Sequence, residues 1–274
     1  MEFCTRARMV VALVACCFGG AAGAAPDLTL GVSEGTSDGL DHSAAIAKYQ
    51  GLANAIGQGL GSKVNVVFVR EFKALEDGVK NGRFDFVAAR PSDYPARGLR
   101  DHGYRYVATT LPEASCHVVA TQDAPYRTLA DLKGRHWVLP EQASFAAQLC
   151  RAELRDQGVD LGRENVKYVR EQGAVTFYLQ NRFAEVGALG SNSGAARQWE
   201  KDGQRVLHKG RPLPYFPLIA HGRFSPAQVE AVQKSLLAMG TDDAGRAALK
   251  AIGVQQFDTG SEQRLRDLLT WLEQ

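Results

Sequence analysis

The sequence predicts an α/β protein of two lobes, with the chain crossing between the lobes more than once. Short apolar runs alternate with segments of helical periodicity, which is typical of parallel sheets covered by helices. Two such alternating sections follow one another, and a mostly helical tail ends the chain. No repeat, low-complexity stretch or polar linker divides the sections, so we expect them to form one continuous unit.

The first section predicts strands and helices in turn. Strands are expected at residues 27–33, 64–69 and 84–89, with helices at 42–60 and 73–81 between them. In the 42–60 segment apolar residues recur at helical spacing and would face the sheet. This β-α-β-α-β order predicts a parallel sheet.

The second section repeats this pattern, and the tail differs from both. For the second section we expect strands at 104–110, 115–121, 136–139, 166–170, 185–189 and 205–208, helices at 144–157, 175–181 and 194–201, and one helical turn at 128–134. For the tail we expect a strand at 216–220 and helices at 226–239, 242–252 and 262–272. Ser225 followed by Pro226 is a typical helix start.

Residues 1–24 have the pattern of a secretory signal. Arg6 and Arg8 form a positive region, residues 9–17 are apolar but too short to span a bilayer, and residues 22–24 fit an Ala-x-Ala cleavage site. We therefore predict export to the periplasm. Lipid attachment at Cys16 is the alternative, because residues 13–16 also fit a lipobox. No other apolar run is long enough to predict a membrane span.

Composition and motifs argue against several functional classes. The chain of 274 residues carries a formal net charge of only +2, so it has no basic field for nucleic acid. The six His residues form no metal-binding pair, and no nucleophile elbow or phosphate loop is present. We expect neither an enzyme nor a cofactor.

Four motifs in order resemble one protein family. They are Asn81-Gly-Arg-Phe-Asp85 at the entry to the third strand, Thr128-Leu-Ala-Asp-Leu-Lys-Gly134, the strand Glu185–Leu189, and Leu213-Pro-Tyr-Phe-Pro-Leu-Ile219 before a Pro-capped helix. With these motifs, residues 27–260 resemble the PhnD-like solute-binding proteins of phosphate, phosphite and phosphonate ABC transporters.

The resemblance implies a type 2 periplasmic binding fold, with a mixed sheet flanked by helices in each lobe and a hinge of two crossovers. Lobe one would comprise residues 27–109 and 216–274, and lobe two residues 110–215. Such a protein closes around a small ligand by hinge motion. The resemblance implies a monomer that delivers an oxyanion, such as a phosphonate, to an ABC permease.

Ligand contacts are expected at the carboxyl ends of strands, where open α/β sheets bind ligands. The candidates are Glu34, Thr36, Ser37, Arg90, Ser92, Tyr94, Gln142, Ser144, Ser191, Asn192, Ser193 and Tyr215. Arg90 is the strongest, because its guanidinium offers an oxyanion a fork of donors. A surface salt bridge is the alternative for Arg90, and helix caps or turns are the alternative for the Ser and Asn residues.

One loop departs from the family. Where the family has a hydroxyl-rich loop at a helix N-terminus, residues 140–145 read Pro-Glu-Gln-Ala-Ser-Phe and keep only the Ser144 hydroxyl. Glu141 would repel an anion if it pointed inward. This departure favours a ligand different from the usual one.

Cys116 and Cys150 are the two cysteines outside the signal. They could form a disulfide, or be buried as small apolar residues. A third possibility is that Cys116 is a free thiol in the cleft, because arsenite-binding members of the same superfamily, which partner a sensor kinase, use a cysteine in a comparable region. The sequence therefore leaves three roles open: an importer component, a metalloid sensor, and an accessory protein of a redox system.

Overall fold

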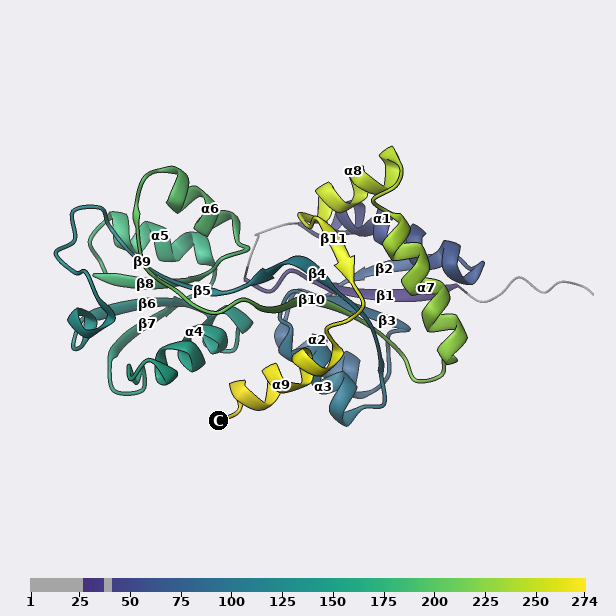
Figure 1. Cartoon of the computed structure of the whole chain (residues 1–274), viewed down its shortest axis with the longest axis horizontal. Coiled ribbons are helices and arrows are strands. Elements are labelled where there is room, and N and C mark those ends of the chain that lie inside the picture. Colours follow the sequence, from purple (N-terminus) through teal and green to yellow (C-terminus); the bar gives the residue numbers. More distant parts are fainter. Residues whose placement is uncertain (1–26, 37–40) are drawn as a thin grey trace, which may run out of the picture.

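The computed structural model describes residues 27–36 and 41–274. The predicted signal, its cleavage site, the lipobox and Ser37 lie outside the described residues. Two lobes stand side by side, and two long strands run between them (Figure 1). Both lobes are sheets flanked by helices, as predicted.

Lobe one contains a six-stranded mixed sheet in the order β11-β4-β10-β3-β1-β2. Its strands are β1 (Leu28–Ser33), β2 (Val64–Phe68), β3 (Phe86–Ala89), β4 (Arg105–Ala114), β10 (Leu213–Ala220) and β11 (Gln256–Asp258). β1 is parallel to β2 and β3, whereas β10 is antiparallel to β3 and β4. The helices are α1 (His42–Leu60), α2 (Phe72–Lys80), α3 (Asp93–Asp101), α7 (Pro226–Ala238), α8 (Asp243–Ile252) and α9 (Glu262–Leu272).

Lobe two contains a five-stranded mixed sheet in the order β7-β6-β8-β5-β9. Its strands are β5 (Cys116–Ala120), β6 (His136–Pro140), β7 (Asn165–Val169), β8 (Val186–Gly190) and β9 (Arg205–Lys209). β6 is parallel to β7 and β8, and β5 is antiparallel to β8 and β9. The helices are α4 (Phe145–Asp156), α5 (Gln172–Gln180) and α6 (Gly194–Lys201), with a short 3₁₀ helix at Leu129–Leu132.

The chain passes between the sheets at Ser115, and returns at residues 210–212. β4 and β10 pair along their length up to this point, where Ala114 faces Leu213. Two adjacent strands leading from one sheet to the other allow the lobes to rotate about a shared axis.

Apolar faces of the helices close the two cores. In lobe one, Tyr49, Leu52 and Ile56 of α1 are fully buried, and α1 also packs against α7 and α8. In lobe two, Trp137 of β6 and Trp199 of α6 are the largest buried side chains. Full burial of one Leu or Ile side chain contributes about 1.5–3 kcal/mol, so these faces hold each sheet to its helices.

A third contact joins the lobes at the C-terminal end of α9, which lies against α4 (Figure 1). The indole Nε1 of Trp271 donates to Asp156 Oδ2 at 2.6 Å, and Arg155 Nη2 donates to the Trp271 carbonyl at 3.2 Å. The Arg211 guanidinium stacks 4.1 Å from the indole centre. The hinge is therefore braced on one side by the last helix.

Two elements of lobe one were not predicted. α3 was missed because Pro95 lies in its sequence, but proline is tolerated in the first turn, where the N–H has no partner inside the helix. β11 was missed because three residues give too little alternation. Among the described helices, none is long and apolar enough to cross a membrane.

Candidate ligand-binding site

A cavity lies between the lobes, at the carboxyl ends of the parallel strands, as the fold predicts. Both lobes line it, with Glu34, Gly35, Thr36, Arg90, Pro91, Ala114 and Tyr215 from lobe one and Phe145, Ala146, Leu149, Gln172, Gly190, Asn192 and Ser193 from lobe two. Its volume is about 20 Å³, room for one water molecule. A ligand the size of a phosphonate therefore needs the lobes to separate before it enters.

A second cavity of about 290 Å³ adjoins the first, because Glu34, Gly35 and Thr36 line both. Its walls include Arg70, Glu71 and Phe72 of lobe one, and Glu141, Arg170 and Glu171 of lobe two. Glu141, in the loop that departs from the family pattern, thus faces this outer cavity and does not line the inner one.

Buried charges of lobe one form a cluster beside the inner cavity. Glu34 is 2% exposed, and its Oε2 accepts from Arg90 Nε at 2.6 Å. Its Oε1 accepts from the Tyr49 hydroxyl at 2.5 Å and lies 2.7 Å from Lys48 Nζ. Burial acts to raise the pKa of the Glu34 carboxyl, but Arg90, Lys48 and the hydrogen bonds outweigh burial and lower the pKa below 4.5. The carboxylate is ionised at neutral pH.

Arg90 lines the cavity, but most of its donors serve lobe one itself. Besides Glu34, its Nη2 donates to the Ile252 carbonyl at 2.6 Å, and its Nη1 reaches the Tyr215 hydroxyl at 3.4 Å. Burial opposes its charge, yet Tyr49, Tyr215 and Glu34 hold the pKa of Arg90 above its ordinary value. The salt bridge considered as the alternative for Arg90 exists, but it is buried and not on the surface.

Tyr215 reaches the cavity through an irregularity in β10. The pairing of β10 with β4 shifts register around Tyr215, and the next residue, Phe216, has a left-handed backbone with φ of 48°. Such a conformation is unfavourable for a bulky residue and persists only where packing enforces it. Here the Phe216 ring is buried, 4.9 Å from the Arg90 guanidinium. On the other side, the Tyr215 ring stacks on Phe145 of lobe two at 6.2 Å.

Lobe two presents two helix N-termini to the cavity. Ser144 caps α4 by accepting from the Ala147 N–H at 3.2 Å, and Ser193 caps α6 by accepting from the Ala196 N–H at 3.0 Å. The earlier N–H groups of each first turn have no partner inside the helix. The positive end of the helix dipole adds to their attraction for an anion.

Gln172, at the start of α5, is the most informative residue that the sequence analysis missed. It is 3% exposed, and its Oε1 accepts from the Gly190 N–H at 2.7 Å. Its Nε2 has no acceptor among the described residues and belongs to the cavity lining. Its backbone N–H donates to the Thr36 carbonyl across the lobes at 3.3 Å. A glutamine opening a helix gives no distinctive signal, although its position after β7 matched the rule applied to the other loops.

The structure brings together about half of the predicted contacts. Glu34, Thr36, Arg90, Asn192, Ser193 and Tyr215 line the inner cavity, and Ser144 acts there only as a cap. The others have different surroundings. Ser92 contacts the Arg90 carbonyl at 3.4 Å, Tyr94 stacks on Phe72 at 5.9 Å, Ser191 binds the Ser115 N–H at 2.9 Å, and Gln142 borders a surface groove between α4 and the C-terminus.

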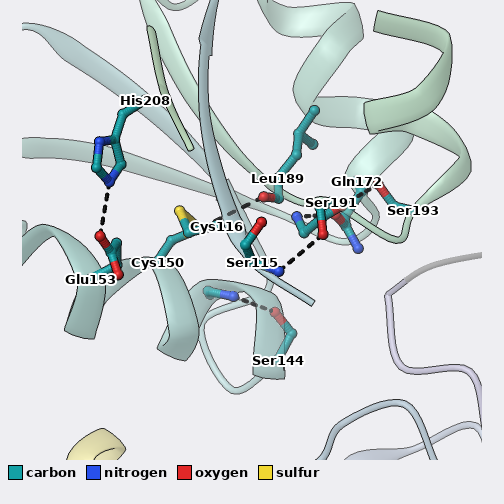
Figure 2. The surroundings of a disulfide bond; sticks show 12 residues. Ser115, Cys116, Ser144, Cys150, Glu153, Gln172, Leu189, Ser191, Ser193 and His208 are labelled. Carbon is teal, nitrogen blue, oxygen red and sulfur yellow. Dashed lines mark hydrogen bonds and ion pairs between the residues drawn. A yellow bond between two sulfur atoms is a disulfide. The ribbon is translucent and has the colours of Figure 1, made fainter. Parts of the chain in front are cut away.

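Of the alternatives that the sequence left open for Cys116, the structure contains the disulfide and not the free thiol. Cys116 and Cys150 form a disulfide, with their Cα atoms 5.0 Å apart, and both residues are buried. A disulfide sulfur offers no thiolate to a metalloid, and Cys116 does not line the cavity. The bond ties α4 to β5, and the Glu153–His208 contact at 2.8 Å lies further along the same helix (Figure 2). The disulfide therefore helps to fix the helix that forms the apolar wall of the cavity.

Solved structures share this fold. XAC2383 from Xanthomonas citri bound to ATP superposes with a TM-score of 0.72 at 17% identity, covering 90% of this chain and 97% of that one. PhnD1 from Prochlorococcus marinus in complex with methylphosphonate gives 0.71 at 12% identity, covering 89% and 96%. The aliphatic sulphonate binding protein SsuA from Escherichia coli gives 0.59 at 16% identity, covering 91% and 84%. At these identities the likeness shows the fold alone.

No curated protein sequence matches the chain as a relative. A family model does match, over residues 39–265, and its description is "ABC transporter, phosphonate, periplasmic substrate-binding protein". The match spans both crossovers and includes the described cavity lining except Glu34, Gly35 and Thr36, which precede it. Members of this family are exported binding proteins that work with ABC permeases. The chain belongs to the family of periplasmic phosphonate-type substrate-binding proteins of ABC transporters.

Proposed function

We propose that this protein captures a small oxyanion in the periplasm and delivers it to the permease of an ABC importer, without catalysing a reaction on it. The observation that carries the ligand class is the set of open donors around the inner cavity. The first-turn N–H groups of α4 and α6 lack partners inside their helices, and Gln172, a buried residue of the lining, has no acceptor for its Nε2 among the described residues.

The set exists only when the lobes are together, because its members come from both sides. Thr36 and Tyr215 approach from lobe one, and Gln172 and the two helix N-termini approach from lobe two. Phe145 and Leu149 give the cavity an apolar side, against which a short organic group of the ligand would lie once the lobes have separated to admit it. Methylphosphonate is the first ligand to test, since one neighbour of the same fold was solved with it.

We do not propose the metalloid sensor, because the sulfur on which it depended is in a disulfide. The mature protein would act as a monomer in the periplasm, and processing near Ala24 is proposed over lipid attachment at Cys16.

The test is stabilisation of the purified mature protein by phosphate, methylphosphonate and methanesulfonate, followed by titration calorimetry. A ligand at 100 times its Kd adds about 2.7 kcal/mol to the free energy of unfolding. Gln172→Ala should weaken binding about tenfold or more, through loss of a buried donor. Gln198→Ala is the matched control, since that side chain is exposed and bonds only to Asp202. No stabilisation by any of these oxyanions would overturn the proposal.

A further inference from the structure

The side-chain acceptor atoms of the described inner lining, apart from the Thr36 hydroxyl, already have partners within the protein. The only carboxylate in the described lining is that of Glu34. Its Oε1 accepts from the Tyr49 hydroxyl and pairs with Lys48, and its Oε2 accepts from Arg90. Loss of any of these partners would destabilise the protein, because the Glu34 carboxylate is buried. Removal of one member of a buried charge cluster leaves the other charges uncompensated.

The amide and carbonyl oxygens are engaged as well. Gln172 Oε1 accepts from the Gly190 N–H at 2.7 Å, and Asn192 Oδ1 lies 3.1 Å from the Ser191 hydroxyl. The Asn192 carbonyl accepts from Arg197 at 2.7 Å, and the Thr36 carbonyl accepts from the Gln172 N–H at 3.3 Å. Each of these oxygens thus already accepts a hydrogen bond within the protein, so a ligand that donates a hydrogen bond finds none of them without a partner.

The donors, in contrast, are open. Gln172 must present Nε2 to the cavity, because its Oε1 is fixed by the Gly190 N–H. The Tyr215 hydroxyl oxygen lies 3.4 Å from Arg90 Nη1, which leaves its own proton to be donated. The first-turn N–H groups of α4 and α6 add further donors. Among the polar side-chain groups of the described lining that have no hydrogen-bond partner, only the Thr36 hydroxyl can either donate or accept.

We infer that the cavity selects an oxyanion whose oxygens carry no proton, a sulfonate in preference to a singly protonated phosphonate. A sulfonate presents three acceptor oxygens, whereas a singly protonated phosphonate has the same charge and nearly the same shape but one P–OH donor. A buried donor without an acceptor costs about 1–3 kcal/mol, roughly a 10–100-fold loss of affinity. The inference rests on the proposed function, since it specifies the oxyanion bound at the same site.

The charge of the site itself should change little across neutral pH. A change of ligand affinity with pH would therefore report protonation of the ligand. In the described inner lining the ionisable groups are Glu34, Arg90 and Tyr215, and the described outer lining adds Arg and Glu but no His. The pKa of Glu34 lies below 4.5 and that of Arg90 above its ordinary value. His42 lies near the outer cavity, with its ring centre 5.9 Å from that of Phe68. The variant His42→Gln therefore serves as a control for this histidine.

The experiment compares methanesulfonate with methylphosphonate by calorimetry between pH 5.5 and 8.5. The expected result is constant affinity for the sulfonate. For the phosphonate, affinity should fall about tenfold per pH unit below its second ionisation, because only the dianion lacks a proton. At pH 5.5 the sulfonate should bind about 10–100-fold tighter. Phosphonate affinity that is flat with pH, or highest at pH 5.5, would overturn the inference and leave the proposed function standing. Failure of both ligands at every pH contradicts the proposed function itself.

A second variant tests the donor role of one residue. Gln172→Glu keeps the oxygen that accepts from Gly190 but replaces the open donor by an acceptor. It should weaken sulfonate binding about tenfold or more and shift the preference at pH 5.5 towards the protonated phosphonate. The exposed Gln198→Glu adds the same charge in lobe two and should leave the preference unchanged. An unchanged preference in Gln172→Glu would contradict the inference.

Discussion

The two lobes face the same cavity with opposite chemistry. Lobe one brings ionised side chains, Glu34 and Arg90, but pairs them with each other and with neighbours in its own core. Among the described residues, lobe two lines the inner cavity with no charged side chain, and offers backbone N–H groups and the Gln172 amide instead. The comparison teaches that a buried charge at a binding site can serve folding, while uncharged groups on the other wall are left to bind the ligand.

The strongest test of this division is Glu34→Ala. The variant leaves Arg90 as an uncompensated buried charge, which should lower the free energy of unfolding by about 3–5 kcal/mol in urea denaturation. Asp77→Ala is the surface control, since its ion pair with Lys73 is exposed and screened by solvent, so its loss should have a far smaller effect.

A double variant distinguishes a charge effect from simple loss of packing. Glu34→Ala combined with Arg90→Met should be more stable than Glu34→Ala alone, because the stranded charge is gone. If the double variant loses the sum of the two single effects, Arg90 is not held by Glu34, and our account of lobe one is wrong.

In lobe two the corresponding support is covalent. Replacing both Cys116 and Cys150 by Ser removes a bond that spans 34 residues, and the chain-entropy relation gives a loss of about 3–4 kcal/mol. Because α4 carries Phe145 and Leu149, hydrogen exchange should rise in this helix, and oxyanion affinity should fall with it. Unchanged exchange in α4 would show that the disulfide does not position the helix.

The fold was largely predictable, because alternating short strands and amphipathic helices are local patterns. The predicted segments around α1, α4 and α7 correspond closely to the observed helices. The two elements that the sequence did not predict, α3 and β11, lack such a clear local pattern. Pro95 argued against a helix that begins just before it, and β11 is too short to show alternation.

The site was less predictable than the fold. The rule that ligands lie at strand ends found Glu34, Thr36 and Arg90, but not the partners of these residues. Glu34 and Arg90 are 56 positions apart, so their pairing depends on the parallel arrangement of β1 and β3 and not on any motif. Gln172 was missed because its role comes from burial and from one fixed oxygen, neither of which residue type alone indicates.

The helix caps allow a matched comparison between stability and binding. Ser144→Ala, Ser193→Ala and Ser225→Ala each remove a side chain that caps a helix, so each should destabilise the protein by about 1 kcal/mol in urea denaturation. Only the first two caps lie at the cavity, on α4 and α6, whereas Ser225 caps α7 of lobe one. Calorimetry should therefore show weaker oxyanion binding for Ser144→Ala and Ser193→Ala, with no change for Ser225→Ala. Equal affinities in all three variants would show that the N-termini of α4 and α6 do not contribute to oxyanion binding.

The smallest expected effect is the fall in the free energy of unfolding at low pH, which depends on a different buried ionisable group in each lobe. Lobe two buries His117 of β5, and burial lowers its pKa below 6.5, opposed by Glu200 and reinforced by Lys209 and His208. The unfolded chain therefore takes up this proton first, so the free energy of unfolding should decline gently as pH drops below about 6.5, and be flat above it. Glu34 of lobe one has a lowered pKa, so its contribution is lost only when pH falls below about 4.5. Urea denaturation of His117→Gln should lack the first decline and keep the second. A decline near pH 6.5 that persists in this variant would assign it to another group, and lobe two would not be the first to weaken in acid.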